Sequence, residues 1–245
     1  MNRANFRFYA QLNYFLPPSK RKITFVHYFK KSRSIKDAIE ALGVPHTEVD
    51  LIIANKESVD FCYLLQDGDL IGVYPRWRSI DITPIVKVRP IEMFFPRFIL
   101  DVHLGKLAKN LRLLGFDTLY RNDYNDEELA EISRREQRIL LTRDVGLLMR
   151  SAVNYGYYVR NTNPWKQLLE VVQHFDLLGK VNAFQRCLCC NGLISLVDKK
   201  LISDRLPEKA KQYYDEFYLC RQCERIYWKG SHHQKMQKFI EQIHR

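Results

Sequence analysis

Four cysteines near the C-terminus place the strongest constraint on how this chain can fold. They form two Cys-x-x-Cys pairs, Cys187 with Cys190 and Cys220 with Cys223, separated by a spacer long enough for a hairpin. Two thiolate pairs on short turns supply the tetrahedral sulfur ligands that structural zinc prefers. Because a full set of four ligands leaves no open coordination position, the pattern predicts a zinc ribbon with a structural role.

The two remaining cysteines do not change this prediction. Cys189 lies inside the first pair as a spare thiol, and Cys62 stands alone in the N-terminal region. A thioredoxin-type dithiol is disfavoured, because there are two pairs and neither opens a helix after a strand. An iron–sulfur cluster is a second alternative, which no further motif supports. In a reducing compartment, grouped cysteines indicate metal rather than disulfides.

Composition narrows the class of protein. The chain carries 39 Lys and Arg against 28 Asp and Glu, and 46% of its 245 residues are hydrophobic. This content can build real cores, and the formal charge of +11 favours a polyanionic partner such as nucleic acid, although ribosomal and membrane-surface proteins share that balance. With neither a signal-peptide pattern nor an apolar run long enough to cross a bilayer, we expect a cytoplasmic protein.

The first 78 residues show the pattern of a β-grasp, or ubiquitin-like, domain. The expected order is two strands, a helix opened by a Ser cap, and two short apolar segments. These elements are expected at residues Phe6–Leu12, Lys22–Phe29, Ser34–Leu42, Val49–Ala54 and Asp69–Tyr74. The ββαββ order predicts the β-grasp fold over 1–78.

Part of this region resembles the sulfur-carrier branch of the ubiquitin-like proteins. The resemblance runs from Gly43-Val44-Pro45 to Gly72-Val73-Tyr74-Pro75. Carriers of that branch end in a Gly-Gly tail, whereas here the chain continues into Arg76 without a diglycine. A carrier role is therefore disfavoured. Docking of a protein partner and gripping of RNA both stay open for this domain.

After a linker predicted at 79–95, strands and helices alternate through a second domain at 96–182. Strands are expected to end at Asp101 and to cover Asp117–Tyr120, Arg138–Thr142 and about Tyr157–Val159. Helices are expected between them, at Leu104–Leu114, Asn125–Glu136 and Asp144–Ala152. Such alternation predicts an α/β domain with a parallel sheet, whose ligands bind beyond the carboxyl ends of the strands.

Acidic residues follow two of these strands. Asp101 closes the first, and Asp144 follows the apolar run Ile139–Leu141. If the strands are parallel neighbours, both carboxylates reach one edge of the sheet, where a hard cation can bridge them. A third acid is expected from the helix start at Asp126 and Glu127. Helix capping remains an alternative explanation for Asp126 and for Asp144.

These acids stand in a pattern that resembles the PIN-like nucleases. The segments from Asp101 to Asp117 and Leu141-Thr-Arg-Asp144 are similar to one branch, the C-terminal RNase domain named after the worm mutator-seven exonuclease. That branch often carries a ubiquitin-like module ahead of it. The resemblance extends to the cysteine segment from Arg186 to Gly192 and to the ending Tyr227–His232.

The resemblance implies an activity and a metal site. It maps the family's acidic metal site onto Asp101, Asp126 and Asp144, with Glu127 as the less certain substitute for Asp126. It implies RNA as substrate and Mg²⁺ or Mn²⁺ as the catalytic ion, and we favour an endoribonuclease. Two rivals stay open: a non-catalytic RNA-binding or RNA-processing partner with the same fold, and an adaptor whose β-grasp domain recruits a protein.

Basic residues near the acids are candidate substrate contacts. Lys106, Lys109 and Arg112 recur at spacings of three on the helix after the first strand, and Arg143 precedes the second strand-end aspartate. They can neutralise phosphates of a bound strand or the charge of the transition state. A solvated helix face is an equally weighted alternative for the three helical residues.

The third predicted domain, residues 183–245, comprises the ribbon and a basic helix at His232–Ile243. It carries 12 Lys and Arg against 7 Asp and Glu, interleaved with aromatic residues. This mixture favours contact with a nucleic-acid strand. Many of the aromatic side chains must fill the small ribbon core, so we predict contact driven by charge and leave base stacking undecided.

Overall fold

The computed structural model describes residues 1–30, 33–76, 88 and 96–243. These residues form two compact units, each assembled from two stretches of chain. The first unit draws on 1–94 and 125–158, and the second on 95–124 and 159–245. The linker predicted at 79–95 lies outside the described residues except for Val88.

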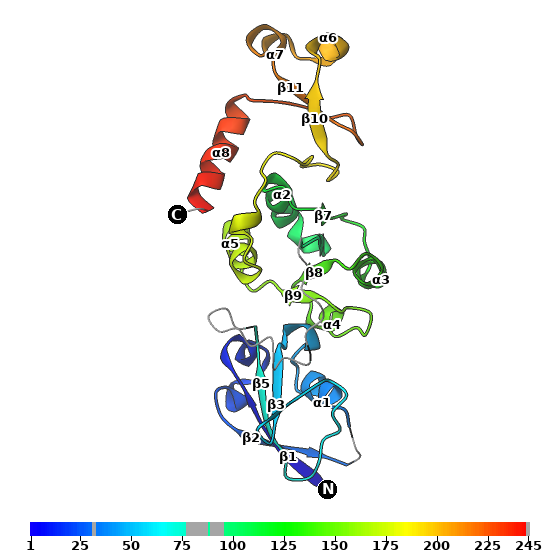
Figure 1. The fold of residues 1–245 in the computed structure, drawn as a ribbon, viewed down its shortest axis with the longest axis vertical. Coiled ribbons are helices and arrows are strands. Elements are labelled where there is room, and N and C mark those ends of the chain that lie inside the picture. Colours follow the sequence, from blue (N-terminus) through cyan, green and yellow to red (C-terminus); the bar gives the residue numbers. More distant parts are fainter. Residues whose placement is uncertain (31–32, 77–87, 89–95, 244–245) are drawn as a thin grey trace. The chain divides into compact units, whose positions relative to one another are not determined.

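A five-stranded sheet with a helix packed against it forms the N-terminal part of the first unit (Figure 1). Its order is β2-β1-β5-β3-β4, and β1 pairs antiparallel with β2 and parallel with β5. The strands are β1 Asn2–Phe8, β2 Phe25–Phe29, β3 Leu51–Ala54, β4 Glu57–Val59 and β5 Leu70–Tyr74. The predicted β-grasp fold is confirmed.

Helix α1, Ile35–Ala41, closes the core of this sheet. Ser34 caps it as predicted, and its side chain accepts a hydrogen bond from the backbone N–H of Asp37 at 3.1 Å. This bond satisfies one of the amides that a helix start leaves unpaired. The buried face of α1, with Ala38 and Ile39, packs against the alternate buried residues of β1.

The first strand lies earlier in the sequence than we predicted. β1 covers Asn2–Phe8 rather than Phe6–Leu12, because the chain turns after Phe8 into a 3-10 helix at Ala10–Phe15. Leu12 in that helix is fully buried in the same core. The apolar pattern therefore continues past the strand although the strand does not.

The α/β region contributes two pairs of parallel strands, with helices between them. β6 and β7 pair in the second unit, and β8 and β9 pair in the first. The strands are β6 Phe98–Leu100, β7 Thr118–Leu119, β8 Ile139–Thr142 and β9 Gly156–Tyr158. Every residue of β6 and β8 is buried, which is typical of parallel strands covered on both faces. The predicted parallel α/β class is confirmed.

Four α-helices accompany these strands, and one of them is absent from the predicted elements. They are α2 Gly105–Leu113, α3 Asp126–Glu136, α4 Val145–Leu148 and α5 Pro164–His174. The missed helix α5 has a clear start signal, since Asn163 caps it and Pro164 occupies its first position. Helix α4 is much shorter than the predicted Asp144–Ala152.

The cysteine region folds as a three-stranded antiparallel sheet in the order β10-β11-β12. Its elements are β10 Ile194–Val197, α6 Lys199–Ile202, α7 Glu208–Tyr213, β11 Phe217–Cys220, β12 Ile226–Trp228 and the C-terminal helix α8 Ser231–Ile243. The spacer between the two cysteine pairs thus holds two short helices besides β10. They pack a small core of Ile202, Leu206 and Ala210 around Phe217.

Within the first unit, buried polar side chains join the β-grasp domain to the segment around β9. His46 Nε2 bonds the carbonyl oxygen of Val153 at 2.9 Å, while its Nδ1 lies 2.6 Å from Oε1 of Glu40. The Glu48 carboxylate accepts the backbone N–H of Tyr158 at 2.6 Å. The hydrogen bond from Tyr158 replaces bonds to water that the Glu48 carboxylate loses when it is buried. The contact between the β-grasp domain and the segment around β9 therefore depends on specific polar partners.

Candidate functional site

The four cysteine thiols of the two pairs converge on one point of the second unit. Their sulfur atoms all lie within 4.8 Å of one another. Cys187 and Cys223 are 3.5 Å apart, and Cys190 and Cys220 are 3.4 Å apart. A tetrahedral zinc with Zn–S bonds of ~2.3 Å separates its sulfurs by roughly 3.8 Å. The four thiols can therefore hold one structural metal ion.

The pKa values of these thiols also favour the binding of a cation. Burial raises the pKa of Cys187, but hydrogen bonds from the Tyr227 hydroxyl and from backbone amides outweigh it and lower the pKa to about 6. Burial raises the pKa of Cys190, and hydrogen bonds to the neighbouring thiols add to that effect. Crowded thiols thus resist a second negative charge, which a bound dication would relieve.

Tyr227 is a partner of this cluster that the sequence did not single out. Its hydroxyl lies 3.0 Å from the sulfur of Cys187 and accepts the backbone N–H of Leu188 at 3.2 Å. Burial and the adjacent Cys187 raise the pKa of Tyr227, so the hydroxyl remains a donor. Such outer contacts orient metal ligands. The signal available in the sequence was its position shortly after the second cysteine pair.

Within the second unit, the first cysteine turn is anchored to the end of helix α2 by a buried arginine. Arg112 is 3% exposed. Its guanidinium donates to the carbonyl of Thr118 at 2.9 Å, and to those of Leu188 and Cys189 at 3.2 Å and 2.8 Å. Arg112 thus has a structural role in place of the substrate contact expected from its spacing.

Asn191 and Arg186 add further hydrogen bonds between the first cysteine turn and the segment that follows α2. The amide of Asn191 accepts the N–H of Thr118 at 2.9 Å and donates to Asp117 at 2.8 Å. Arg186 donates to the carbonyl of Gly115 at 3.2 Å. Gly115 has a φ of +95°, and a Cβ there would stand 2.0 Å from a backbone oxygen. Only glycine fits this approach of the two backbones.

We expect Arg112→Met to destabilise the protein by at least about 3 kcal/mol, because one buried and two part-buried carbonyls lose a charged donor. Denaturant unfolding of the full chain measures the loss. Lys109→Met on the exposed side of the same helix is the matched control, with a change within about 0.5 kcal/mol. Equal stability of the two variants would contradict the structural role.

Asp101 follows β6 directly, as predicted, and belongs to the second unit. It is 6% exposed, and its Oδ1 accepts the backbone N–H of His103 at 2.9 Å. The short 3-10 helix Val102–Leu104 and then α2 begin from this point. A buried carboxylate at a strand end is the position in which ligands of open α/β sheets are found.

Asp144 follows β8 and caps the short helix α4 in the first unit. Its Oδ1 accepts from the backbone N–H groups of Gly146 and Leu147 at 2.7 and 3.2 Å. The capping alternative raised for Asp144 is therefore confirmed as a structural fact. A cap uses one carboxylate oxygen, and the side chain is exposed, so the second oxygen remains available to a cation.

Asp126 opens helix α3 without capping it. The cap is Asn125, whose side chain accepts the N–H of Glu128 at 2.9 Å, while Glu128 accepts the N–H of Asn125 at 3.0 Å. This reciprocal pair is a capping box. Asn125, not Asp126, is therefore the cap, whereas Asp126 lies in the first helical turn, where a carboxylate complements the helix dipole. Asp126 is exposed, as is Glu127, and forms an ion pair with Arg150 at 3.6 Å.

The three aspartates are divided between the two units. Asp126 and Asp144 lie in the first unit and Asp101 in the second, so their convergence on a shared cation remains a prediction. Among residues 1–30, 33–76, 88 and 96–243, the four thiols are the one group of three or more close metal-ligand atoms.

The predicted basic contacts differ in exposure. Lys106 and Lys109 are both exposed on α2, which begins shortly after Asp101. Arg143 is half-buried beside Asp144.

The α/β region is followed by a ribbon whose four close cysteines can hold one metal ion. In a comparison with protein families, residues 96–240 match the model described as Mut7-C RNAse domain, and residues 1–81 match the one described as Mut7-C ubiquitin. The chain belongs to the Mut7-C RNAse domain family. No curated protein and no solved structure matches it. None of the helices in the described residues has the length and apolar character to cross a membrane.

Proposed function

We propose that this protein is a metal-dependent endoribonuclease whose Mg²⁺ or Mn²⁺ site is formed by Asp101, Asp126 and Asp144. One observation carries the proposal: within a chain that contains an RNAse domain, Asp101 and Asp144 each follow the carboxyl end of a buried parallel strand. That is where open α/β sheets bind their ligands. Glu127 is the alternative third acid.

The proposed reaction is hydrolysis of a phosphodiester bond. Water adds across one P–O bond, which leaves a phosphate on one fragment and a hydroxyl on the other. Divalent ions at the site would generate the attacking hydroxide and stabilise the leaving oxygen. The carboxylates position the ions, and the second oxygen of Asp144 can ligate while the first keeps its cap. Arg143 and the two α2 lysines would hold the RNA phosphates.

The other parts of the chain have proposed roles around this reaction. The four thiols would hold a structural zinc, and the ribbon would contribute basic surface to RNA binding. The β-grasp domain would recruit a protein partner. Its edge strand β2 exposes Val26 and Tyr28, at 42% and 57%, which suits such a contact. We place the activity in the cytoplasm.

Circular and linear RNAs of the same sequence test the proposal. The full chain, with its zinc retained, is incubated with each RNA in the absence of other metals, then with added Mg²⁺ or Mn²⁺. We expect cleavage of both forms only after the addition, because an endonuclease needs no free end. Loss of the linear form alone would indicate an exonuclease. Survival of both forms across a panel of cellular RNAs would favour the non-catalytic RNA-binding rival.

Lys106 and Lys109 give a prediction about RNA affinity. The logarithm of RNA affinity falls as the logarithm of salt concentration rises, and each phosphate contact on a single strand adds about 0.7 to the steepness of that fall. Replacing both lysines with Gln should therefore make the slope shallower by about 1.4. Binding titrations at several salt concentrations measure the slope. The double variant Lys166→Gln/Lys180→Gln removes two exposed lysines from the same unit as a control. Equal slopes for the two double variants would contradict the assignment.

A further inference from the structure

A small cavity lies between the ribbon and helix α8, inside the second unit. It has a volume of about 170 Å³, and its lining includes Phe184, Tyr218, Tyr227, Lys229 and His233. Drug-sized ligands occupy cavities of roughly 300–1,000 Å³. The cavity therefore suits one ring-sized group rather than an extended molecule.

The strand register explains which aromatic rings reach this cavity. Tyr218 of β11 and Tyr227 of β12 are directly opposite each other, so their side chains share one face of the ribbon sheet. Their neighbours Phe217 and Trp228 are also paired, and both contribute to the ribbon core. One face of the sheet thus contributes to the core, although Trp228 also lines the cavity, and the two tyrosines on the other face line the cavity.

Several of the aromatic residues that line the cavity have contacts that hold their rings in place. The Tyr227 ring is held through its hydroxyl by the sulfur of Cys187 at 3.0 Å. Phe184 and His233, which also line the cavity, are stacked with ring centroids 4.2 Å apart. The Tyr218 hydroxyl donates a long hydrogen bond, 3.5 Å, to Glu216. A cavity lined by several aromatic rings is suited to a flat guest.

A cation stands at the rim of the cavity. Lys229 lines it, and its Nζ lies 5.9 Å from the centroid of the Tyr218 ring. The same ammonium pairs with Glu216 at 2.6 Å, and the side chains of Lys229 and Glu216 are 53% and 57% exposed. Exposed pairs contribute little free energy, so a phosphate can take the place of Glu216 at small cost.

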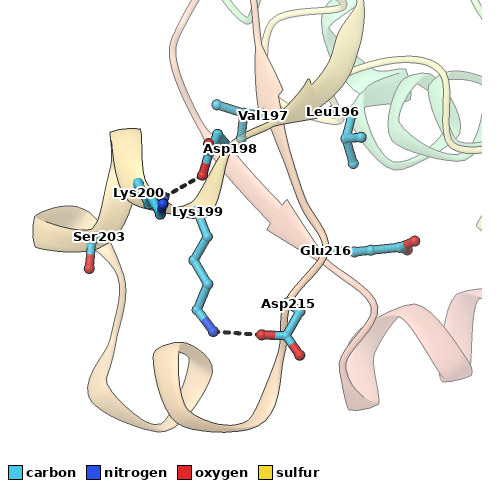
Figure 2. Close-up of a pocket in the computed structure, with 8 residues that line it drawn as sticks. All are labelled: Leu196, Val197, Asp198, Lys199, Lys200, Ser203, Asp215 and Glu216. Carbon is cyan, nitrogen blue, oxygen red and sulfur yellow. Dashed lines mark hydrogen bonds and ion pairs between the residues drawn. The ribbon is translucent and has the colours of Figure 1, made fainter.

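The larger hollow at the end of β10 lacks the aromatic lining of this cavity (Figure 2). Its volume is about 680 Å³, and its lining includes the carboxylates Asp198, Asp215 and Glu216 but no aromatic ring. Lys199, the lysine that reaches across it, is paired with Asp215 at 2.8 Å (Figure 2). Without an aromatic ring on which a base can stack, this hollow does not suit a nucleotide base.

We propose that the aromatic cavity between the ribbon and α8 binds one base of a single-stranded RNA, stacked on Tyr218, with the adjoining phosphate at Lys229. The inference builds on the proposed RNA substrate and adds a second contact outside the carboxylate site. Because every base has an aromatic face, the site tolerates different sequences.

Binding of fluorescent single-stranded RNA to the zinc-loaded full chain, without added Mg²⁺ or Mn²⁺, tests the proposal. We expect Tyr218→Ala to weaken binding about 5- to 150-fold, the effect of losing one stacked base. Tyr218→Phe keeps the ring and should bind within about twofold of the parent. Tyr213→Ala removes a 70% exposed tyrosine of the same ribbon from outside the cavity and is the matched control.

A second probe separates stacking from phosphate contact. In an RNA of equal length whose central nucleotides lack bases, Tyr218→Ala should cause no further loss. An equal loss on both RNAs, or unchanged binding of the variant to intact RNA, would overturn the cavity as a base site. So would a parent protein that binds no single strand. Cleavage is scored separately with Mn²⁺: base-dependent binding without cleavage would overturn the ribonuclease and leave the cavity standing.

Discussion

Asp144→Asn is expected to lower the rate of RNA cleavage at least about 100-fold while the protein stays folded and still binds RNA. Loss of a residue that only supports a metal ligand already costs 10- to 100-fold in activity, and Asp144 is proposed as a direct ligand. Asparagine is as good a helix cap as aspartate. Its amide oxygen can therefore keep the bonds from Gly146 and Leu147, so the variant removes the charge and not the fold.

The measurement is single-turnover cleavage in Mg²⁺ and in Mn²⁺, beside RNA affinity without either ion. Asp101→Asn should behave in the same way. Asp123→Asn is the control, because Asp123 is an exposed carboxylate paired with Arg121 at 2.6 Å and lies outside the proposed site. Unchanged cleavage by Asp144→Asn would remove that residue from the site. A loss shared by Asp123→Asn would point to general charge.

Cys190→Ser is expected to release the structural zinc and unfold the ribbon. The parent protein should contain one zinc per chain, whereas the variant should lose it to a moderate chelator. Zinc contributes ~10–16 kcal/mol of apparent binding free energy in small zinc-folded peptides, which matches or exceeds the whole stability of a typical domain, about 5–15 kcal/mol. Elemental analysis and thermal melting follow the two effects.

Cys189→Ser is the matched control for this experiment. Cys189 lies between two of the ligands but is exposed and outside the four-thiol group. The control should keep its zinc and its melting temperature within a few degrees of the parent. Stoichiometric zinc in chelator-treated Cys190→Ser, or loss of zinc from Cys189→Ser, would contradict the ligand assignment.

The elements with strong local signals could be predicted from the sequence. The buried strands β6 and β8 are short apolar runs that end at polar residues, and Ser34 caps α1 where expected. The prediction of a strand was wrong where a residue buried by tertiary packing continued the apolar pattern of that strand. Leu12 extends the apolar alternation of β1 although it lies in a 3-10 helix packed on the same core.

The candidate site was less predictable, because its decisive contacts join distant parts of the chain. The four-thiol cluster follows from cysteine spacing alone. Arg112, by contrast, has the spacing of an exposed helical residue, and only the return of the chain at Leu188 and Cys189 buries it. Asp126 likewise resembled a cap until Asn125 was found to fill that position. The meeting of the three carboxylates stays a prediction that the cleavage experiments decide.

The bonds of Arg112 also limit how the protein can be shortened or recombined. A fragment that ends after α5 would lose two of the three acceptors of the Arg112 guanidinium, the carbonyls of Leu188 and Cys189, and with them the chain that buries it. Hydrogen bonds to charged groups contribute about 1.5–3 kcal/mol each, a large share of the roughly 5–15 kcal/mol stability of a typical domain. Chimeras between relatives should therefore exchange the ribbon together with the helix on which it rests.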